Sequence, residues 1–134
     1  MWNCPNCNRN FYTTNQSHTC SQTEIGELFK NKSDELVLAF DAIINLTEPW
    51  KPNTFGAAKH SIVFHSKRAW LIVKPMKSEL DLKFYLDTEL ESEVFKKVTD
   101  FFGKYAHHIR IKNEQDLNKE VVDLLRIGFD YSIR

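Results

Sequence analysis

Hydrophobic and polar positions in the first half of the chain follow a helical period. Apolar residues between positions 36 and 44 recur at spacings of three and four, which predicts an amphipathic helix ending near Leu46. Ser33 is a suitable N-cap, and two acidic residues follow it in the first turn, where negative charge suits the helix dipole. Residues 48–53 contain two prolines and therefore predict a loop after this helix.

Beyond Gly56 the period of the pattern changes to two. Residues 60–65, 69–74 and 80–86 each divide into two alternating sets, which predicts three strands. The third segment is the most regular, because leucine or phenylalanine occupies every even position from 80 to 86. Short connections between the three segments predict an antiparallel meander.

The last third of the chain predicts one further strand and one helix. Residues 94–102 fit either period, so their structure stays open between helix and strand. Residues 105–112 alternate and predict a strand, after which Asn113 is a suitable N-cap for a closing helix whose apolar face spans 117–128. The predicted fold class is α+β, with an antiparallel sheet of about four to five strands and two helices covering one face.

A histidine and all three cysteines of the chain lie in its first twenty residues with the spacing of metal ligands. Cys4-x2-Cys7 is followed by ten residues and then by His18-x-Cys20. A Cys-x-x-Cys turn brings both sulfurs to one ion, and ligands two apart on an extended segment share one side. Thiolates and an imidazole suit zinc, whereas iron–sulfur clusters usually take four cysteines. We expect Cys4, Cys7, His18 and Cys20 to bind a structural zinc ion with no open coordination position.

Two other interpretations of these cysteines stay open. They could be unrelated reduced thiols near a surface histidine, or a redox Cys-x-x-Cys, although such redox motifs usually follow a strand within a longer fold. On the zinc interpretation, residues 1–22 form a zinc knuckle and residues 23–134 form the α+β domain, with a linker or short helix over 21–32. A segment so poor in aliphatic residues needs the metal to fold.

Length and composition are those of a globular protein. The 134 residues suit one domain with a small appendage, and a hydrophobic content of 42% excludes disorder for most of the chain. No apolar run approaches the ~20 residues of a membrane helix, and the first residues lack the features of a signal peptide. We therefore expect a cytoplasmic protein without a membrane partner.

Charge is balanced overall but unevenly distributed. The formal net charge is +0, which argues against nucleic-acid binding through the charge of the whole molecule. Residues 50–77, however, carry six basic side chains and no acidic one, and residues 94–112 carry five basic against one acidic. Adjoining strands would make a basic face with aromatic side chains for base stacking. The candidate nucleic-acid-binding residues are Lys59, Lys67, Arg68, Trp70 and Lys74.

The alternatives to a nucleic-acid site are ordinary solubilising lysines on strands, or a basic patch for a phosphate ligand or an acidic protein. Catalytic candidates are few, because no glycine-rich phosphate loop or nucleophile motif is present. His107 and His108 fall on opposite faces of one strand, as His60 and His65 do by parity, so neither pair can hold one metal. We interpret these histidines as core or rim residues and assign no catalytic residue.

The two cysteine-containing segments resemble a known family. Residues 2–11 read Trp-Asn-Cys-Pro-Asn-Cys-Asn-Arg-Asn-Phe and residues 15–20 read Asn-Gln-Ser-His-Thr-Cys, with looser similarity at 60–64 and 107–111. This sequence resembles the domain of unknown function 5655 family of small bacterial proteins. Where that family usually has glycine after the second cysteine, this chain has Asn8, which tolerates positive φ better than most residues.

The resemblance implies a zinc knuckle before a single domain and no settled activity. Related domains are sometimes fused to nuclease-like or restriction-associated proteins, which associates the family with nucleic acid. We therefore expect a zinc-stabilised binding module for nucleic acid. The alternative is a protein-interaction or small-ligand adaptor that uses exposed aromatic side chains or a pocket between sheet and helices. An enzyme using His60, His65 or His108 is the third hypothesis.

Overall fold

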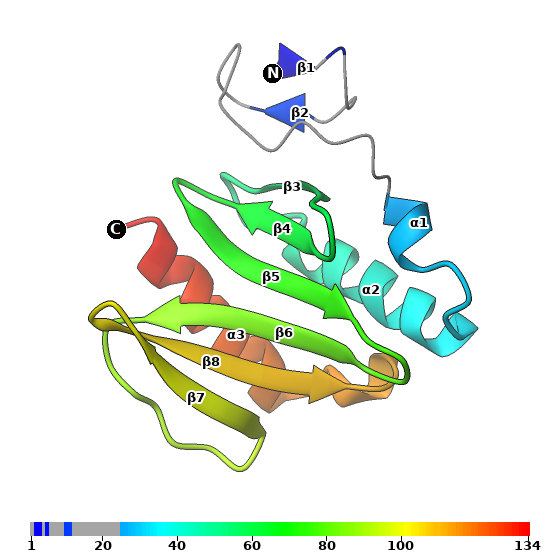
Figure 1. Ribbon diagram of the computed structural model, residues 1–134. Helices are drawn as coiled ribbons and strands as arrows, with labels where there is room; N and C mark the ends of the chain where they lie inside the picture. Colours follow the sequence, from blue (N-terminus) through cyan, green and yellow to red (C-terminus); the bar gives the residue numbers. More distant parts are fainter. Residues whose placement is uncertain (1, 4, 6–9, 12–24) are drawn as a thin grey trace.

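The structure is a computed structural model that describes residues 2–3, 5, 10–11 and 25–134 (Figure 1). Its elements in chain order are β1 (Trp2–Asn3), β2 (Asn10–Phe11), α1 (Ile25–Leu28), α2 (Asp34–Thr47), β3 (Thr54–Ala57), β4 (Ile62–His65), β5 (Ala69–Pro75), β6 (Leu80–Leu86), β7 (Phe95–Phe101), β8 (Lys104–Ile111), the 3₁₀ helix η1 (Glu114–Asp116) and α3 (Lys119–Ser132). The fold class is α+β, as the sequence predicts. The main sheet has the strand order β3-β4-β5-β6-β8-β7, and all its pairs are antiparallel.

Helices α2 and α3 pack on the same face of the main sheet, behind it in Figure 1. Phe40 of α2 contacts Phe64 of β4 edge to face, with ring centroids 6.3 Å apart. Gly128 of α3 lies against Phe84 of β6. Phe64 and Phe84 are both paired with Leu71 across the ladder, so the two helices cover one continuous core.

The main sheet has six strands, so the prediction of about four to five is corrected. The additional strand β3 lies within a segment that shows no clear alternation, and it forms because Phe55 pairs with Phe64 of β4. Residues 94–102, which fit either period, contain the edge strand β7. A register shift between Phe95 and Lys97 explains why neither phase fits the whole segment.

The meander of three strands predicted from alternation is confirmed as β4-β5-β6. Two places depart from alternating burial. In β6, Asp81 is buried between Leu80 and Leu82; in β5, Trp70 and Leu71 are consecutive and both buried. The register of β4 with β5 shifts there, since Phe64 pairs with Leu71 but His65 pairs with Ala69. Such an irregularity turns two neighbouring side chains out of strict alternation.

The helix boundaries follow local capping. Ser33 caps α2 as predicted, because its hydroxyl accepts a hydrogen bond of 3.3 Å from the backbone N–H of Leu36. The closing helix, in contrast, does not begin at Asn113, whose side chain caps only η1. Leu117 then leaves helical geometry, and α3 begins at Lys119 under a second cap, Asn118.

Within the described ranges, no helix has the length and apolar character that crossing a bilayer requires.

Candidate functional site

Strand register determines which side chains share the face of the main sheet that is turned away from α2 and α3. Lys74 on β5 pairs with Asp81 on β6. Lys83 on β6 pairs with His108 on β8, which in turn pairs with Lys97 on β7. Paired residues point to the same face. We call this surface the open face; its charged and aromatic members on these four strands are Lys74, Asp81, Lys83, Tyr85, Lys97, Lys104, His108 and Arg110.

The acidic group at the centre of the open face is fully engaged by its neighbours. Asp81 accepts hydrogen bonds from Arg110 Nε at 2.5 Å and lies 3.0 Å from His108 Nδ1. Arg110 also donates to Glu79 at 3.1 Å. The bond to Asp81, followed by that to Glu79, raises the pKa of Arg110 above its ordinary value. The two carboxylates therefore compensate the positive charge of Arg110. The Asp81 residue itself is only 7% exposed.

The four lysines of the open face have no such partners. In the described part of the chain, Lys74, Lys83, Lys97 and Lys104 form no ion pair with a carboxylate side chain. The helical side of the molecule has the opposite sign, since α2 carries three acidic residues and no basic one. Although the net charge is zero, the positive charges are concentrated on the open face of the sheet and negative charges on α2.

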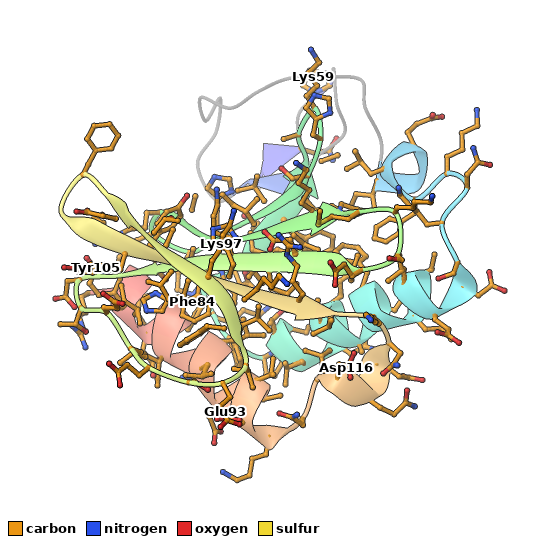
Figure 2. All side chains as sticks on the ribbon, turned by 60° about the horizontal axis from the view of Figure 1, so that its bottom comes forward. Lys59, Phe84, Glu93, Lys97, Tyr105 and Asp116 are labelled. Carbon is orange, nitrogen blue, oxygen red and sulfur yellow. The ribbon has the colours of Figure 1, made fainter. Side chains whose placement is uncertain are left out.

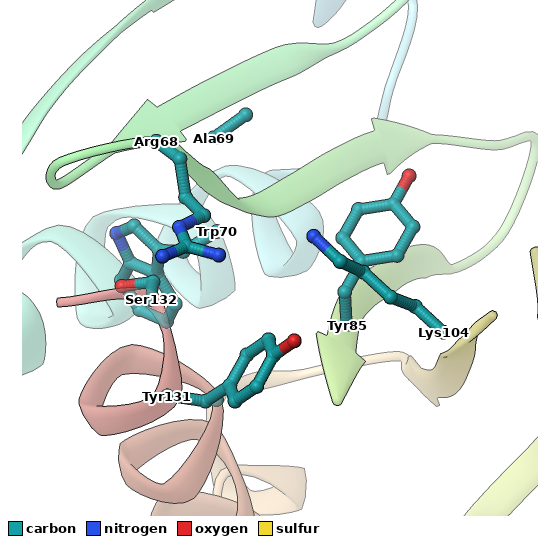
Figure 3. A pocket seen from close by; sticks show the side chains of 8 residues that line it. Arg68, Ala69, Trp70, Tyr85, Lys104, Tyr131 and Ser132 are labelled. Carbon is teal, nitrogen blue, oxygen red and sulfur yellow. The ribbon is translucent and has the colours of Figure 1, made fainter. Parts of the chain in front are cut away.

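A pocket opens where the main sheet divides. The ladder between β5 and β6 ends at the pair Leu71–Phe84. Beyond that pair, β5 continues only with β4, while β6 continues with β8 to the pair Leu86–Tyr105. The C-terminal end of α3 lies close to this opening (Figure 1). The result is a cavity of about 300 Å³, which we call the sheet-end pocket (Figure 3).

The walls of the sheet-end pocket combine aromatic rings with cations. Trp70, Tyr85 and Tyr131 supply the rings, and Arg68 and Lys104 supply the charges. Figure 3 shows the Lys104 amine directed across the opening toward the Arg68 guanidinium. An apolar pocket with a few convergent polar groups is the usual form of a small-ligand site.

Positive charge gathers around one ring of this pocket. Arg68, Lys104 and Arg134 lie 5.7, 5.9 and 5.6 Å from the ring centroid of Tyr131. Arg68 Nη2 also donates a hydrogen bond of 3.1 Å to the backbone oxygen of Arg134, the last residue of the sequence. Of the described carboxylate side chains, none forms an ion pair with these three cations.

Trp70, one of the residues predicted from sequence, does not lie on the surface. Its side chain is 2% exposed, and its indole N–H donates a hydrogen bond of 3.1 Å to Asn53 Oδ1. The expectation that Trp70 offers an exposed stacking surface is therefore wrong. The register shift in β5 turns the indole into the core, where it contacts Phe129 and forms the inner wall of the sheet-end pocket.

The four predicted cations do not form one cluster. Lys67 and Arg68 lie in the turn between β4 and β5, whereas Lys74 lies near the opposite end of β5. Seven residues of β5 extend for about 20 Å, which separates the two groups. Lys59 lies in the connection between β3 and β4, at the Lys74 end of β5, because its neighbour His60 lines one depression with Lys74. Figure 2 shows Lys59 far from Lys97 of the open face.

His107 is a core residue, as predicted. It is fully buried and stacks on Phe84 with an interplanar angle of 11°. Its Nε2 accepts a hydrogen bond of 3.0 Å from the backbone N–H of Leu90, so Nδ1 carries the proton and donates to the carbonyl oxygen of Tyr105. Burial lowers the pKa of His107 below its ordinary value, which keeps the ring neutral.

Sequence reasoning missed the residues that complete both surfaces. Lys83, Lys97 and Lys104 join the open face only once the order β6-β8-β7 is known. Tyr131 was not singled out because it follows the apolar stripe predicted for the closing helix. One signal for these lysines is present in the sequence. Each occupies a strand position that alternates with the apolar residues, so its side chain points to the face away from the core.

The predicted zinc ligands Cys4, Cys7, His18 and Cys20 lie outside the described residues. Strands β1 and β2 form an antiparallel pair whose backbone register pairs Asn3 with Asn10, and in the sequence two of the four predicted ligands fall between these strands. Among the residues that the structure describes, no group of three or more His, Cys, Asp or Glu side chains is arranged to hold a metal.

The family profile of the domain of unknown function 5655 (DUF5655) matches residues 25–132. The chain therefore belongs to this family, and the match covers the whole α+β body. The N-terminal segments that carry the more specific resemblance lie outside the match. No curated protein and no solved structure is significantly similar to the chain.

Proposed function

We propose that the protein is a non-enzymatic module that binds single-stranded nucleic acid on the open face. One observation carries the proposal: Lys74, Lys83 and Lys97 face the same way on β5, β6 and β7, and none of them forms an ion pair with a described carboxylate side chain. Strands lie ~4.8 Å apart, so the surface from β5 to β7 is about 14 Å wide and can contact several phosphates.

The open face also has a surface suited to bases. Tyr85 lies on it, with the Lys83 ammonium 5.7 Å from its ring centroid. Proteins that bind single strands combine lysines that follow the backbone with aromatic rings on which bases stack. The acidic α2 repels phosphate on the opposite side of the molecule, so the charge distribution orients an approaching strand toward the sheet.

The proposal is tested by fluorescence anisotropy with a labelled single-stranded oligonucleotide over a range of salt concentrations. Each phosphate contact with a single strand contributes about −0.7 to the slope of log K against log salt, so four lysines predict a slope near −3. The K83Q/K97Q variant should reduce the magnitude of that slope by about 1.4. The charge-matched control is K51Q/K119Q, which removes two exposed lysines outside the open face. Absence of binding at low salt, or equal slopes for all variants, would overturn the proposal.

We also propose that Cys4, Cys7, His18 and Cys20 hold one structural zinc ion. The support is the donor set itself, three thiolates and one imidazole, together with the β1–β2 pair around the first two cysteines. A cytoplasmic location, which keeps thiols reduced, fits this proposal. Native mass spectrometry should find one zinc ion per chain, and a chain that carries no transition metal would contradict it.

The alternative of a small-ligand adaptor is favoured by the sheet-end pocket. Its volume of about 300 Å³ and its aromatic walls are those of a ligand site. Tyr85 and Lys104 belong to the pocket and to the open face, so one ligand can occupy both.

A further inference from the structure

We infer that the sheet-end pocket binds a nucleoside monophosphate group, with the base against its aromatic walls and the phosphate monoester between Arg68 and Lys104. The inference rests on the proposed function, because it assigns the pocket to the same class of ligand as the open face. The group can belong to the phosphorylated end of a strand or to a free nucleotide.

The shape of the pocket suits a planar ring. Its volume of about 300 Å³ is at the lower end of the ~300–1,000 Å³ range of small-ligand pockets. Tyr85 approaches from β6 and Tyr131 from α3, so flat apolar surfaces line it on two sides (Figure 3). Gly128 and the buried Trp70 also line it, on the side of the core.

The charges of the pocket favour an anionic ligand. Arg68, Lys104 and Arg134 all lie within 6 Å of the Tyr131 ring centroid, and no described carboxylate side chain forms an ion pair with them. Arg68 keeps its hydrogen bond to the backbone oxygen of Arg134. An anion bound beside the Tyr131 ring would be attracted by all three cations. A guanidinium opposite an ammonium provides directed donors for phosphate oxygens from two sides.

A terminal phosphate suits these cations better than an internal one. A phosphate monoester carries about −1.5 to −2 charges at neutral pH and has three strong acceptor oxygens. An internal phosphodiester carries one charge, which the single lysines of the open face can contact. The pocket lies at the end of β6 where the open face stops, so a strand on that face reaches it with its terminal nucleotide.

The test measures how much a terminal phosphate strengthens binding, by isothermal titration calorimetry with the full chain. One arm uses pentathymidylate carrying a 5′-phosphate, a 3′-phosphate or hydroxyls at both ends. The other arm compares thymidine 5′-monophosphate with thymidine. We expect at least one phosphorylated ligand to bind about tenfold more tightly than its hydroxyl counterpart. This gain should disappear in R68Q/K104Q and persist in K51Q/K119Q, which removes the same charge elsewhere.

The two arms identify the source of the nucleotide. A gain confined to the strand assigns the pocket to a phosphorylated end, and a gain confined to the monophosphate assigns it to a free nucleotide; either supports the inference. Equal binding of phosphorylated and hydroxyl ligands overturns it, as does a gain that survives in R68Q/K104Q. In those cases the proposed function would still hold if the strand binds in a salt-dependent way and K83Q/K97Q weakens that binding. A gain for the monophosphate with no affinity for any strand would remove the proposed function alone.

Discussion

Gly128 on α3 lies directly against the ring of Phe84 on β6. A Cβ atom placed on Gly128 would be 2.8 Å from Phe84 Cδ2 and 3.2 Å from Phe84 Cβ. The helix therefore approaches the sheet more closely than any residue with a side chain would permit. This contact holds α3 beneath the point where β5 and β6 separate, and so helps to form the floor of the sheet-end pocket.

We predict that G128A destabilises the protein by about 1–3 kcal/mol, because the added methyl group must displace the Phe84 ring. Helix propensity alone would make the alanine variant more stable by ~1 kcal/mol. A lower free energy of unfolding for G128A would therefore show that the clash with Phe84 outweighs propensity. The matched control is G26A in α1, where a Cβ meets nothing within 4 Å. Urea unfolding measures both variants, and an equally stable G128A would show that α3 can move away from β6.

Protonation of His107 should weaken the fold. Its lowered pKa means that the unfolded chain binds more protons than the folded one below about pH 6.5, so stability falls as pH decreases through that range. A proton on Nε2 would also break the hydrogen bond that this nitrogen accepts from the Leu90 N–H. Urea midpoints between pH 5 and 8 should show this decline in the wild type and a smaller one in H107F. H60Q, which alters an exposed histidine, should behave like the wild type.

Removal of the Asp81 charge should change stability and binding in opposite directions. D81N leaves His108 without its carboxylate and Arg110 with Glu79 alone, which should cost about 2 kcal/mol of stability for this partly buried network. The same change removes a negative charge from the open face and should strengthen oligonucleotide binding at low salt. D123N, which breaks an exposed pair on α3, should change stability by less than about 0.5 kcal/mol and leave binding unaltered.

Chelation of the proposed zinc ion should leave the α+β body intact. The core consists of residues from Leu36 to Phe129, and the predicted metal ligands all precede residue 25. A strong chelator should therefore release one zinc ion and expose three reactive thiols, while the thermal unfolding midpoint of the body stays the same. Thiol titration and far-ultraviolet circular dichroism measure the two effects. Unfolding of the α+β body on chelation would contradict the proposed domain boundary near residue 22.

Strands with strict alternation were predictable because their signal is local. The β6 segment presents leucine or phenylalanine at every second position, and all four of these side chains are buried. β3 gave no such signal, since Thr-Phe-Gly-Ala has no alternation and becomes a strand only by pairing with β4. β7 was ambiguous because its register shift changes the phase within the segment.

The candidate site was predictable only in part. The basic segment 50–77 identifies both Arg68 and Lys74. In the structure these two residues lie at opposite ends of β5, with Arg68 just before its first residue. Trp70 was expected at the surface, and its burial follows from a pairing irregularity with β4. The partners that complete the surfaces, Lys97 and Lys104, are brought in by β7 and β8 from a distant part of the chain.

The amino-acid sequence by itself determined the α+β class, the Ser33 cap, the central meander and the metal-ligand spacing of the N-terminus. Each of these depends on periodicity or spacing within a few residues. Tertiary structure alone decided which lysines share a face and where a pocket opens. Both depend on strand order and on where the β5–β6 ladder ends, and such long-range pairing is set by the whole core rather than by any one segment.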